Sequence, residues 1–359
     1  MFDIKSLFSK RKSIVGLDIG SSSIKLLEIA DTPKGYQLTH FSMLPLPRGI
    51  IADGIIHDPK ALTDHIKELF KKTSFARKGI ATSLSGHSVI VKKVNFNLME
   101  DNELRELLKD EAGKYLPFDN MNDVSFDFHI LGPTDYNPNQ MNVMLVAAKK
   151  DVVNSYVDAI IDAGMTATIM DVDSFALETM FEENYSFDEN EVTILVNIGA
   201  SITNINVVQG GSSIFTRDFT LGGNAITEAI QEKMGISFEE AEDIKLGTAE
   251  VDESVIKEIH DSLLIFAEPL CSEIERSIEY FTSTYGSESV KRVILSGGGA
   301  NIPGIAADLS HRLNIEAEIV KPFQKIEIGK NVIDAKDISN IAPIAAVGVG
   351  LALRRVGDR

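Results

Sequence analysis

A short polar motif near the N-terminus carries residue types that bind phosphate when they stand at a tight turn. Gly20 tolerates the positive φ that such a turn needs, and the amides after it can form an anion-binding nest. Asp18 can orient a water bound to Mg²⁺. An ordinary β-hairpin with a polar turn has the same pattern, so the motif alone leaves both interpretations open. The candidate phosphate loop consists of Asp18, Gly20, Ser21, Ser22, Ser23 and Lys25.

A degraded copy of this motif recurs at residues 194–208. Both copies predict a strand, a tight turn and a second strand, and such a repeat predicts two similar lobes that close on one nucleotide. The copies differ at one chemically important position, because Asn197 stands where the first copy has Asp18. The candidate residues of the second loop are Asn197, Gly199, Ala200 and Ser201.

Glycine-rich turns supply further candidates. The run Gly297, Gly298 and Gly299 follows a strand and precedes a helix, where a ligand can approach the backbone closely. A tight strand-to-helix turn is the alternative, and the run is not a GxGxxG fingerprint with a downstream acid. Gly222 and Gly223 open another predicted helix.

Composition narrows the class of protein. The chain has 359 residues, enough for about two to three domains. Its net charge of −18 argues against general nucleic-acid binding, which needs clustered cations. Its one cysteine, Cys271, excludes an internal disulfide, and the scattered histidines do not favour a zinc site. With no apolar run long enough to span a bilayer and no signal peptide, we expect a cytoplasmic protein.

The pattern of apolar residues predicts alternating strands and helices. Residues 80–164 read as an inserted α+β module of order β-α-β-β-α. Residues 1–12 mix apolar and basic side chains and fit either a frayed tail or a segment resting on an anionic membrane. The remaining expected strands are 13–30 (a pair), 36–44, 165–171, 192–208 (a pair), 213–220 and 290–295, and the expected helices are 59–72, 174–183, 224–234, several within 238–285, and 341–355.

The order of these motifs resembles the actin-like ATPase superfamily. The resemblance implies an α/β, two-lobed actin-like (ribonuclease-H-like) fold, and the inserted module resembles the 1C subdomain of the FtsA and PilM families. Segments 145–150, 163–165 and 171–177 are more similar to the PilM family. The implied division is an N-terminal tail at 1–12, subdomain 1A at 13–79, 165–188 and 336–359, subdomain 1C at 80–164, and lobe 2 (2A/2B) at 189–335.

The resemblance also assigns roles to the candidate residues. ATP and Mg²⁺ would be the cofactors, with Asp18 reaching the metal through water and the two loops holding the phosphates. Glu242 and Lys245 match adenosine and ribose contacts, and the glycines at 297–299 match the adenine side. Asp173 lies where active relatives place the group that orients the attacking water. Because Asn197 brings no charge to a position that usually has one, we expect slow or negligible hydrolysis.

In function, the resemblance implies a cytoplasmic scaffold of the type IV pilus inner-membrane assembly complex. Its partner would be the N-terminal cytoplasmic tail of a PilN-like inner-membrane protein, bound as an extended peptide between subdomains 1A and 1C. Other pilus components, possible self-association and a peripheral place at the membrane follow from the same resemblance, and no nucleic acid is expected. The alternatives are an FtsA-like division filament, whose C-terminal membrane helix has no counterpart here, and an actin-fold metabolite kinase, whose sugar-recognition loop we do not find.

Overall fold

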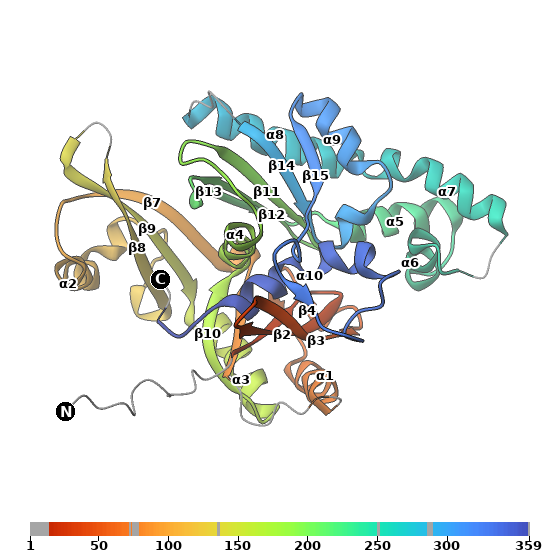
Figure 1. Ribbon diagram of the computed structural model, residues 1–359, viewed down its shortest axis with the longest axis horizontal. Coiled ribbons are helices and arrows are strands. Elements are labelled where there is room, and N and C mark those ends of the chain that lie inside the picture. The colour runs from red at the N-terminus through yellow and green to blue at the C-terminus, as the bar shows by residue number, and fades with distance from the viewer. Residues whose placement is uncertain are drawn as a thin grey trace.

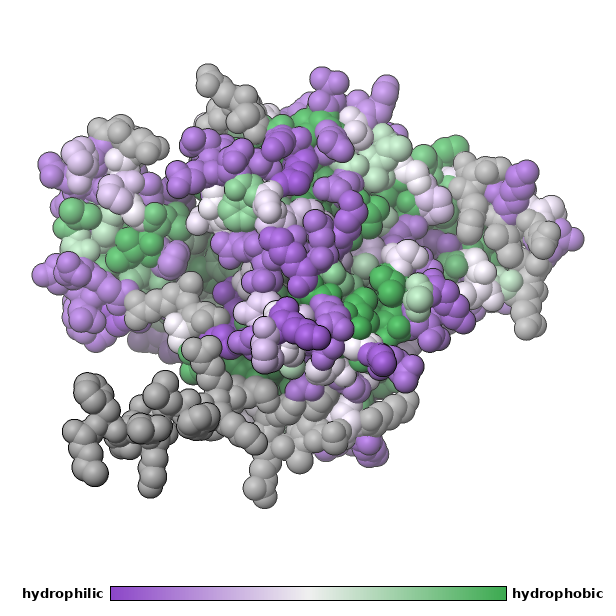
Figure 2. All heavy atoms as spheres, viewed as in Figure 1, coloured by the Kyte–Doolittle hydropathy of each residue, from purple (hydrophilic) through white to green (hydrophobic). Residues whose placement is uncertain are grey.

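The computed structural model describes residues 14–71, 73, 79–134, 137–249, 252–285 and 290–357, so the predicted tail at 1–12 lies outside the described residues. Within these, two large sheets form the centres of two lobes, and a smaller sheet stands at the side of the first lobe (Figure 1). On the face shown in Figure 2, hydrophilic residues are widespread and alternate with smaller hydrophobic areas.

The first sheet has the strand order β10-β6-β1-β2-β3-β16. Its central strand is buried along its whole length because helices cover both faces. Helices α1 and α3 pack on one face, and α4 and α10 on the other. The strands are β1 (Ile14–Ile19), β2 (Ser23–Thr32), β3 (Gly35–Pro45), β6 (Gly79–Leu84), β10 (Thr166–Val172) and β16 (Glu327–Ile328), and the helices are α1 (Pro59–Lys71), α3 (Lys150–Asp162), α4 (Asp173–Asn184) and α10 (Ile338–Leu353).

The second sheet repeats this topology. Its order β13-β12-β11-β14-β15 corresponds strand for strand to β3-β2-β1-β6-β10, with an antiparallel hairpin followed by parallel strands. The sequence repeat is therefore a repeat of the fold, as predicted. The elements are β11 (Val192–Ile198), β12 (Thr203–Gln209), β13 (Ser212–Phe219), β14 (Val290–Ser296), β15 (Glu316–Ile319), α5 (Gly223–Met234), α6 (Phe238–Leu246), α7 (Glu253–Phe266), α8 (Glu268–Tyr285) and α9 (Ile305–Leu313).

The inserted module is a three-stranded sheet of order β7-β9-β8 packed on one helix. Its elements are β7 (Val89–Asn97), α2 (Asp101–Glu111), β8 (Val124–Thr134) and β9 (Asn137–Lys149), which are the first four members of the predicted order β-α-β-β-α. The fifth member, α3, follows β9 along the chain but packs in the core of the first sheet. Helix α2 ends at Glu111 and is followed by a 3₁₀ turn at Ala112–Lys114.

Three elements lie in a different sheet or core from the one the predicted ranges imply. Strand β6 and helix α3 fall inside the predicted module 80–164, yet β6 pairs with β1 and β10, and α3 packs in the core of the first sheet. Strand β16 falls inside the predicted lobe 2 but pairs with β3. Two of these are strand pairings over long sequence distances, which the local pattern of a strand does not reveal.

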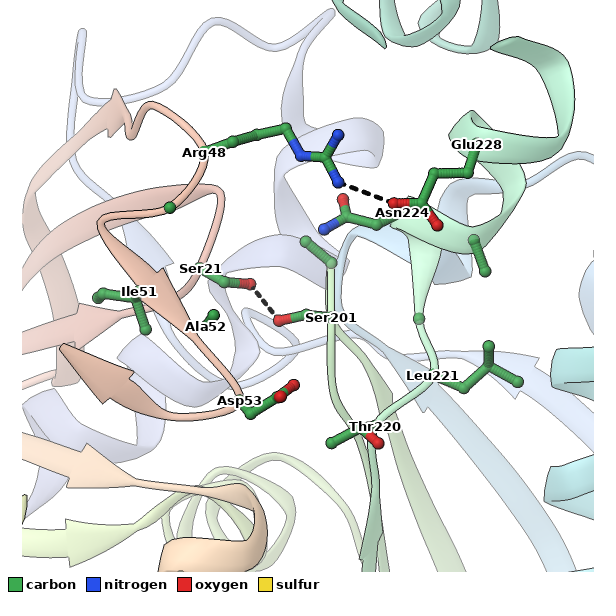
Figure 3. A pocket seen from close by; sticks show the side chains of 14 residues that line it. Ser21, Arg48, Ile51, Ala52, Asp53, Ser201, Thr220, Leu221, Asn224 and Glu228 are labelled. Atoms are coloured by element: carbon green, nitrogen blue, oxygen red, sulfur yellow. Dashed lines mark hydrogen bonds and ion pairs between the residues drawn. The ribbon is translucent and has the colours of Figure 1, made fainter. Parts of the chain in front are cut away.

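A small hairpin leaves the first lobe toward the second. It consists of β4 (Ile51–Ala52) and β5 (Ile55–Ile56), joined by Asp53 and Gly54. Both turn residues have positive φ, 51° and 75°, which is the conformation of the turn type common in two-residue hairpins. This hairpin borders the cleft between the lobes (Figure 3).

Candidate functional site

A cavity of about 550 Å³ lies between the two lobes. The turns of both repeated hairpins, helix α6 and the glycine-rich turn after β14 form its walls. The structure thus brings together residues from across the chain. Of the predicted site residues, those that line the cavity are Asp18, Gly20, Ser21, Ser22, Ser23, Lys25, Asp173, Asn197, Gly199, Ala200, Ser201, Gly223, Glu242, Lys245, Gly297, Gly298 and Gly299, whereas Gly222 lines a neighbouring cavity of about 480 Å³.

The first hairpin holds a buried ion pair at the cavity. Asp18 and Lys25 are register partners across β1 and β2, and Lys25 Nζ lies 3.1 Å from Asp18 Oδ2. Only 11% of each side chain is exposed. The turn between them closes with a bond from the Gly20 amide to the Ser23 carbonyl (3.1 Å). Lys25 therefore has a counterion before any phosphate arrives, and a phosphate would bring it a second one.

The second hairpin has a neutral pair at the corresponding place. Asn197 and Asn204 are register partners across β11 and β12, and Asn197 Nδ2 donates to Asn204 Oδ1 at 3.0 Å. Both side chains are buried, and Ser296 Oγ donates to Asn197 Oδ1 at 3.4 Å. Asn204 lines the cavity but was missed from the sequence. Its signal was its spacing, seven residues after Asn197, as Lys25 follows Asp18.

The turns of the two hairpins touch each other. Ser201 Oγ donates to Ser21 Oγ at 2.7 Å, as Figure 3 shows. The second turn is also fastened to the start of α5, where the Gly223 amide donates to the Gly199 carbonyl at 2.9 Å. A Cβ at Gly222 would lie 2.5 Å from that same carbonyl, so only glycine fits there. Gly222 thus allows the start of α5 to pack directly against the second loop.

Opposite the hairpins, α6 presents a carboxylate and an ammonium group one helical turn apart. Lys245 Nζ lies 2.6 Å from Glu242 Oε2. Both contact Thr227 of α5, because Lys245 donates to Thr227 Oγ1 (2.8 Å) and Thr227 donates to Glu242 (2.5 Å). Thr227 was also missed, because a single threonine within a predicted helix belongs to no motif that would indicate a site.

The three glycines after β14 serve different ends. A Cβ at Gly297, whose φ is 81°, would lie 2.3 Å from the Ile198 carbonyl, and one at Gly299 would lie 2.1 Å from the Ile198 side chain. These two glycines are needed for packing on the end of β11. A Cβ at Gly298 would meet no other heavy atom within 4 Å, so this glycine is the one that leaves room for a ligand.

Asp173 begins α4 on the floor of the cavity. Ser83 Oγ donates to its Oδ1 at 2.5 Å. Burial raises the pKa of this carboxyl to about 7, and the negative charge of Asp18 acts in the same direction. A carboxylate with such a pKa can accept a proton at neutral pH. Asp218, which the sequence did not single out, is a half-buried acid whose charge also acts on Asp173, and desolvation raises the pKa of Asp218 as well.

Within the described part of the chain, no three His, Cys, Asp or Glu side chains gather as a metal centre. Magnesium usually keeps several waters and one or two carboxylates beside the phosphates of its nucleotide, so it needs no such cluster. Asp18, at the mouth of the first turn, has the donor chemistry for a contact through water. The residues present therefore fit a nucleotide that brings its metal with it.

Comparisons with known proteins identify relatives over nearly the whole chain. The family model described as "Type IV pilus assembly protein PilM" matches residues 16–356. A solved PilM-PilN type IV pilus biogenesis complex is 29% identical, covers 97% of this chain and 100% of that one, and has a TM-score of 0.82. FtsA of Borreliella burgdorferi is 23% identical over 91% of this chain and 88% of that protein.

The fold recurs in a more distant actin-like protein. MreB5 of Spiroplasma citri, solved with ADP, shares 13% identity over 94% of each chain with a TM-score of 0.51. The mixed α/β, two-lobed architecture is thus that of the actin-like ATPases, as expected from the sequence. Among the described helices, none is both long and apolar enough to cross a bilayer. With a family model matched from residue 16 to residue 356, this chain belongs to the PilM family of type IV pilus assembly proteins.

Proposed function

We propose that this chain is an ATP-binding scaffold of the type IV pilus inner-membrane assembly complex, with slow or negligible hydrolysis. The observation that carries the proposal is the pair of facing hairpins, one with Asp18 and Lys25 and the other with Asn197 and Asn204, on one cavity. The scaffold role agrees with the family to which the chain belongs. The proposals of ATP binding and slow hydrolysis are based on the geometry of the two hairpins.

Binding is favoured by donors that converge from both lobes. Lys25, the turn hydroxyls of Ser21 and Ser201, and the backbone of both turns all border the cavity. Charge-assisted bonds to phosphate are about twice as strong as neutral ones. ATP with Mg²⁺ would join the two lobes, and the lobe closure would set the surface offered to partners.

Hydrolysis is disfavoured by the neutral second hairpin. Asn197 already donates to Asn204 and accepts from Ser296, and it carries no charge to position a metal or an attacking water. Asp173 is the remaining candidate for the water, and its bond with Ser83 holds it at the cavity floor. Losing a positioning group lowers the rate of cleavage about 10²–10⁴-fold, so bound ATP would remain largely intact.

The partner would be the N-terminal cytoplasmic tail of a PilN-like inner-membrane protein, which would hold this chain at the membrane. The similar solved structure is described as a PilM-PilN complex, which supports this choice. In the inserted sheet, β7 and β8 are the edge strands, and edge strands can pair with an extended peptide. Helix α3 follows β9 directly and packs into the first lobe, so this sheet adjoins subdomain 1A.

The test is a nucleotide titration of wild type against Asp18→Ala, with and without the PilN tail peptide from the same organism. We expect wild type to bind Mg-ATP, Asp18→Ala to bind it more weakly, and the peptide to bind while a scrambled peptide does not. Rapid Mg²⁺-dependent phosphate release by wild type would overturn the slow-hydrolysis part. Absence of any nucleotide binding would overturn the cofactor, and absence of peptide binding the partner.

A further inference from the structure

The chain enters the inserted module at a turn that is hydrogen-bonded to the second lobe. After β6 of the first sheet, the 3₁₀ turn η2 (Gly86–Ser88) leads directly into β7 of the module. The Gly86 amide donates to Asp218 Oδ2 at 2.7 Å, although the two residues lie 132 positions apart. Asp218 belongs to β13, the edge strand of the second sheet, and β13 contacts both η2 and β7 (Figure 1). The start of the module is thus bonded to the opposite lobe.

Asp218 is also the last member of a polar row that crosses the second sheet. Successive register partners on β14, β11, β12 and β13 are Ser296, Asn197, Asn204 and Asp218. Ser296 Oγ donates to Asn197 Oδ1 at 3.4 Å, and Asn197 Nδ2 donates to Asn204 Oδ1 at 3.0 Å. Asn197 and Asn204 line the candidate nucleotide cavity, whereas Asp218 lies beyond its lining. The row therefore leads from the cavity to the start of the module.

The step from Asn204 to Asp218 is the loosest of this row. Asn204 is only 3% exposed, and its Nδ2 has no hydrogen-bond partner in the part of the chain that the structure describes. Desolvation raises the pKa of Asp218, but the amides of Asn204 and Gly86 oppose this rise because both stabilise the carboxylate. An unsatisfied buried donor is unfavourable, so a closer approach of Asn204 to Asp218 would be stabilising.

The turn of the second hairpin contacts the start of the module directly as well. A Cβ at Gly86, whose φ is 75°, would lie 2.7 Å from Ile202 Cδ1, so glycine is favoured at this position. Ile202 follows Ser201 of the second candidate phosphate loop and lines the cavity. Gly86 has no side chain with which to hold this contact, so the bond from its amide to Asp218 keeps η2 in place.

We propose that Asp218 is a positioning residue that makes the position of the inserted module depend on the bound nucleotide. The inference rests on the proposed nucleotide site and adds a route from that site to the module. Phosphates bound at the second loop would fix Ile202 and Asn204. Asp218 then holds Gly86 against them through a charge-assisted bond, which is about twice as strong as a neutral one. The contacts form a continuous path, as coupling between two distant sites requires.

Replacement of Asp218 by Ala removes the acceptor of the Gly86 amide and leaves the lining of the cavity unchanged. In wild type, Mg-ATP should slow amide hydrogen exchange in residues 86–97 at least about fivefold, the lower end of typical coupling between sites. In Asp218→Ala the slowing should be less than about twofold, although Mg-ATP still binds. Asp218→Asn, which keeps an acceptor oxygen, should retain a weaker nucleotide effect. The matched control is Asp127→Ala, which removes an acid of β8 whose ion-pair partner, Arg105, lies in the same module.

The experiment is hydrogen exchange with mass spectrometry on the full chain, with and without saturating Mg-ATP, and calorimetry on the same samples measures binding. Equal slowing in Asp218→Ala and wild type overturns the inference, and so does a wild type that binds Mg-ATP without slowing; in both cases the proposed function stands. A wild type that binds no Mg-ATP overturns the proposed function and this inference with it. If thermal unfolding shows that Asp218→Ala does not fold, Asp218→Asn replaces it, and slowing as large as in wild type then overturns the inference.

Discussion

The side-chain hydroxyls of Ser21 and Ser201 are hydrogen-bonded to each other at 2.7 Å, although the residues lie 180 positions apart. One comes from the turn of the first lobe and the other from the equivalent turn of the second. This contact therefore joins the two lobes at the point where both candidate phosphate loops meet.

Nucleotide phosphates would compete for these two hydroxyls. Ser21→Ala or Ser201→Ala should lower ATP affinity about threefold to tenfold, the value of one lost hydrogen bond. Stability without nucleotide should change by no more than about 1 kcal/mol, because the lost bond is between neutral groups. Calorimetric titration and thermal unfolding check both statements. Ser283→Ala on α8, an exposed serine in the second lobe, is the matched control and should bind ATP as wild type does.

Asn197→Asp restores a charge to the second hairpin. Its carboxylate can still accept from Ser296, and the Asn204 amide can turn to donate to it. We expect the rate of ATP cleavage with Mg²⁺ to rise by about 10² or more. Continuous phosphate-release assays at saturating ATP measure it, with Asn197→Ala as the control that removes the amide without adding charge. An unchanged rate in Asn197→Asp would show that position 197 does not limit hydrolysis.

Asp173→Asn should alter the dependence of stability on pH. Burial raises the folded-state pKa of Asp173 to about 7, above its usual value near 3.8. Between those values the folded state binds the extra proton, so this residue makes stability fall as the pH rises through that window. The variant keeps an oxygen for Ser83 and should be more stable than wild type at pH 8, by roughly 1–3 kcal/mol.

Denaturant unfolding from pH 4 to pH 8 measures this effect. Glu178 is a half-buried acid whose pKa desolvation also raises to about 7, so Glu178→Gln should flatten the same window independently. A wild-type profile that rises toward pH 8, or an Asp173→Asn profile parallel to that of wild type, would contradict the assigned pKa.

Arg48 crosses the cleft mouth from the first lobe. Its guanidinium lies 2.7 Å from Glu228 of α5 and 3.7 Å from the centre of the Phe238 ring of α6. About half of each side chain of the ion pair is exposed, so the pair adds little stability. Arg48→Ala should leave the unfolding temperature nearly unchanged.

The same variant should speed nucleotide release severalfold, because it removes the contact that joins the two lobes at the mouth of the cleft. Stopped-flow displacement of a fluorescent ATP analogue measures the rate, and Glu228→Gln, which keeps the ring contact, should lie between Arg48→Ala and wild type. Release as slow from Arg48→Ala as from wild type would mean that the mouth contact does not gate the cavity.

Much of the fold followed from local patterns. Apolar alternation around Gly20 and Gly199 predicted both hairpins, and the helix expected at 59–72 is present as α1, where Asp58 accepts from the Ala61 amide at 2.9 Å. Short strands were missed, as β15 and β16 have four and two residues and carry little periodic signal. Strand β6 was also missed, and its sheet membership was not predictable, since parallel pairing joins strands that are distant in sequence.

The sequence by itself determined which groups the loops can offer: an acid and a lysine in the first hairpin, and amides in the second. It also set the turns, because glycine and serine impose their geometry locally. Tertiary structure alone decided how these groups act. It joined Ser21 to Ser201, placed Thr227 between Glu242 and Lys245, and desolvated the Asp173 carboxyl, which raises its pKa. The reason is physical: hydrogen bonding across lobes and desolvation depend on neighbours that only the folded chain brings together.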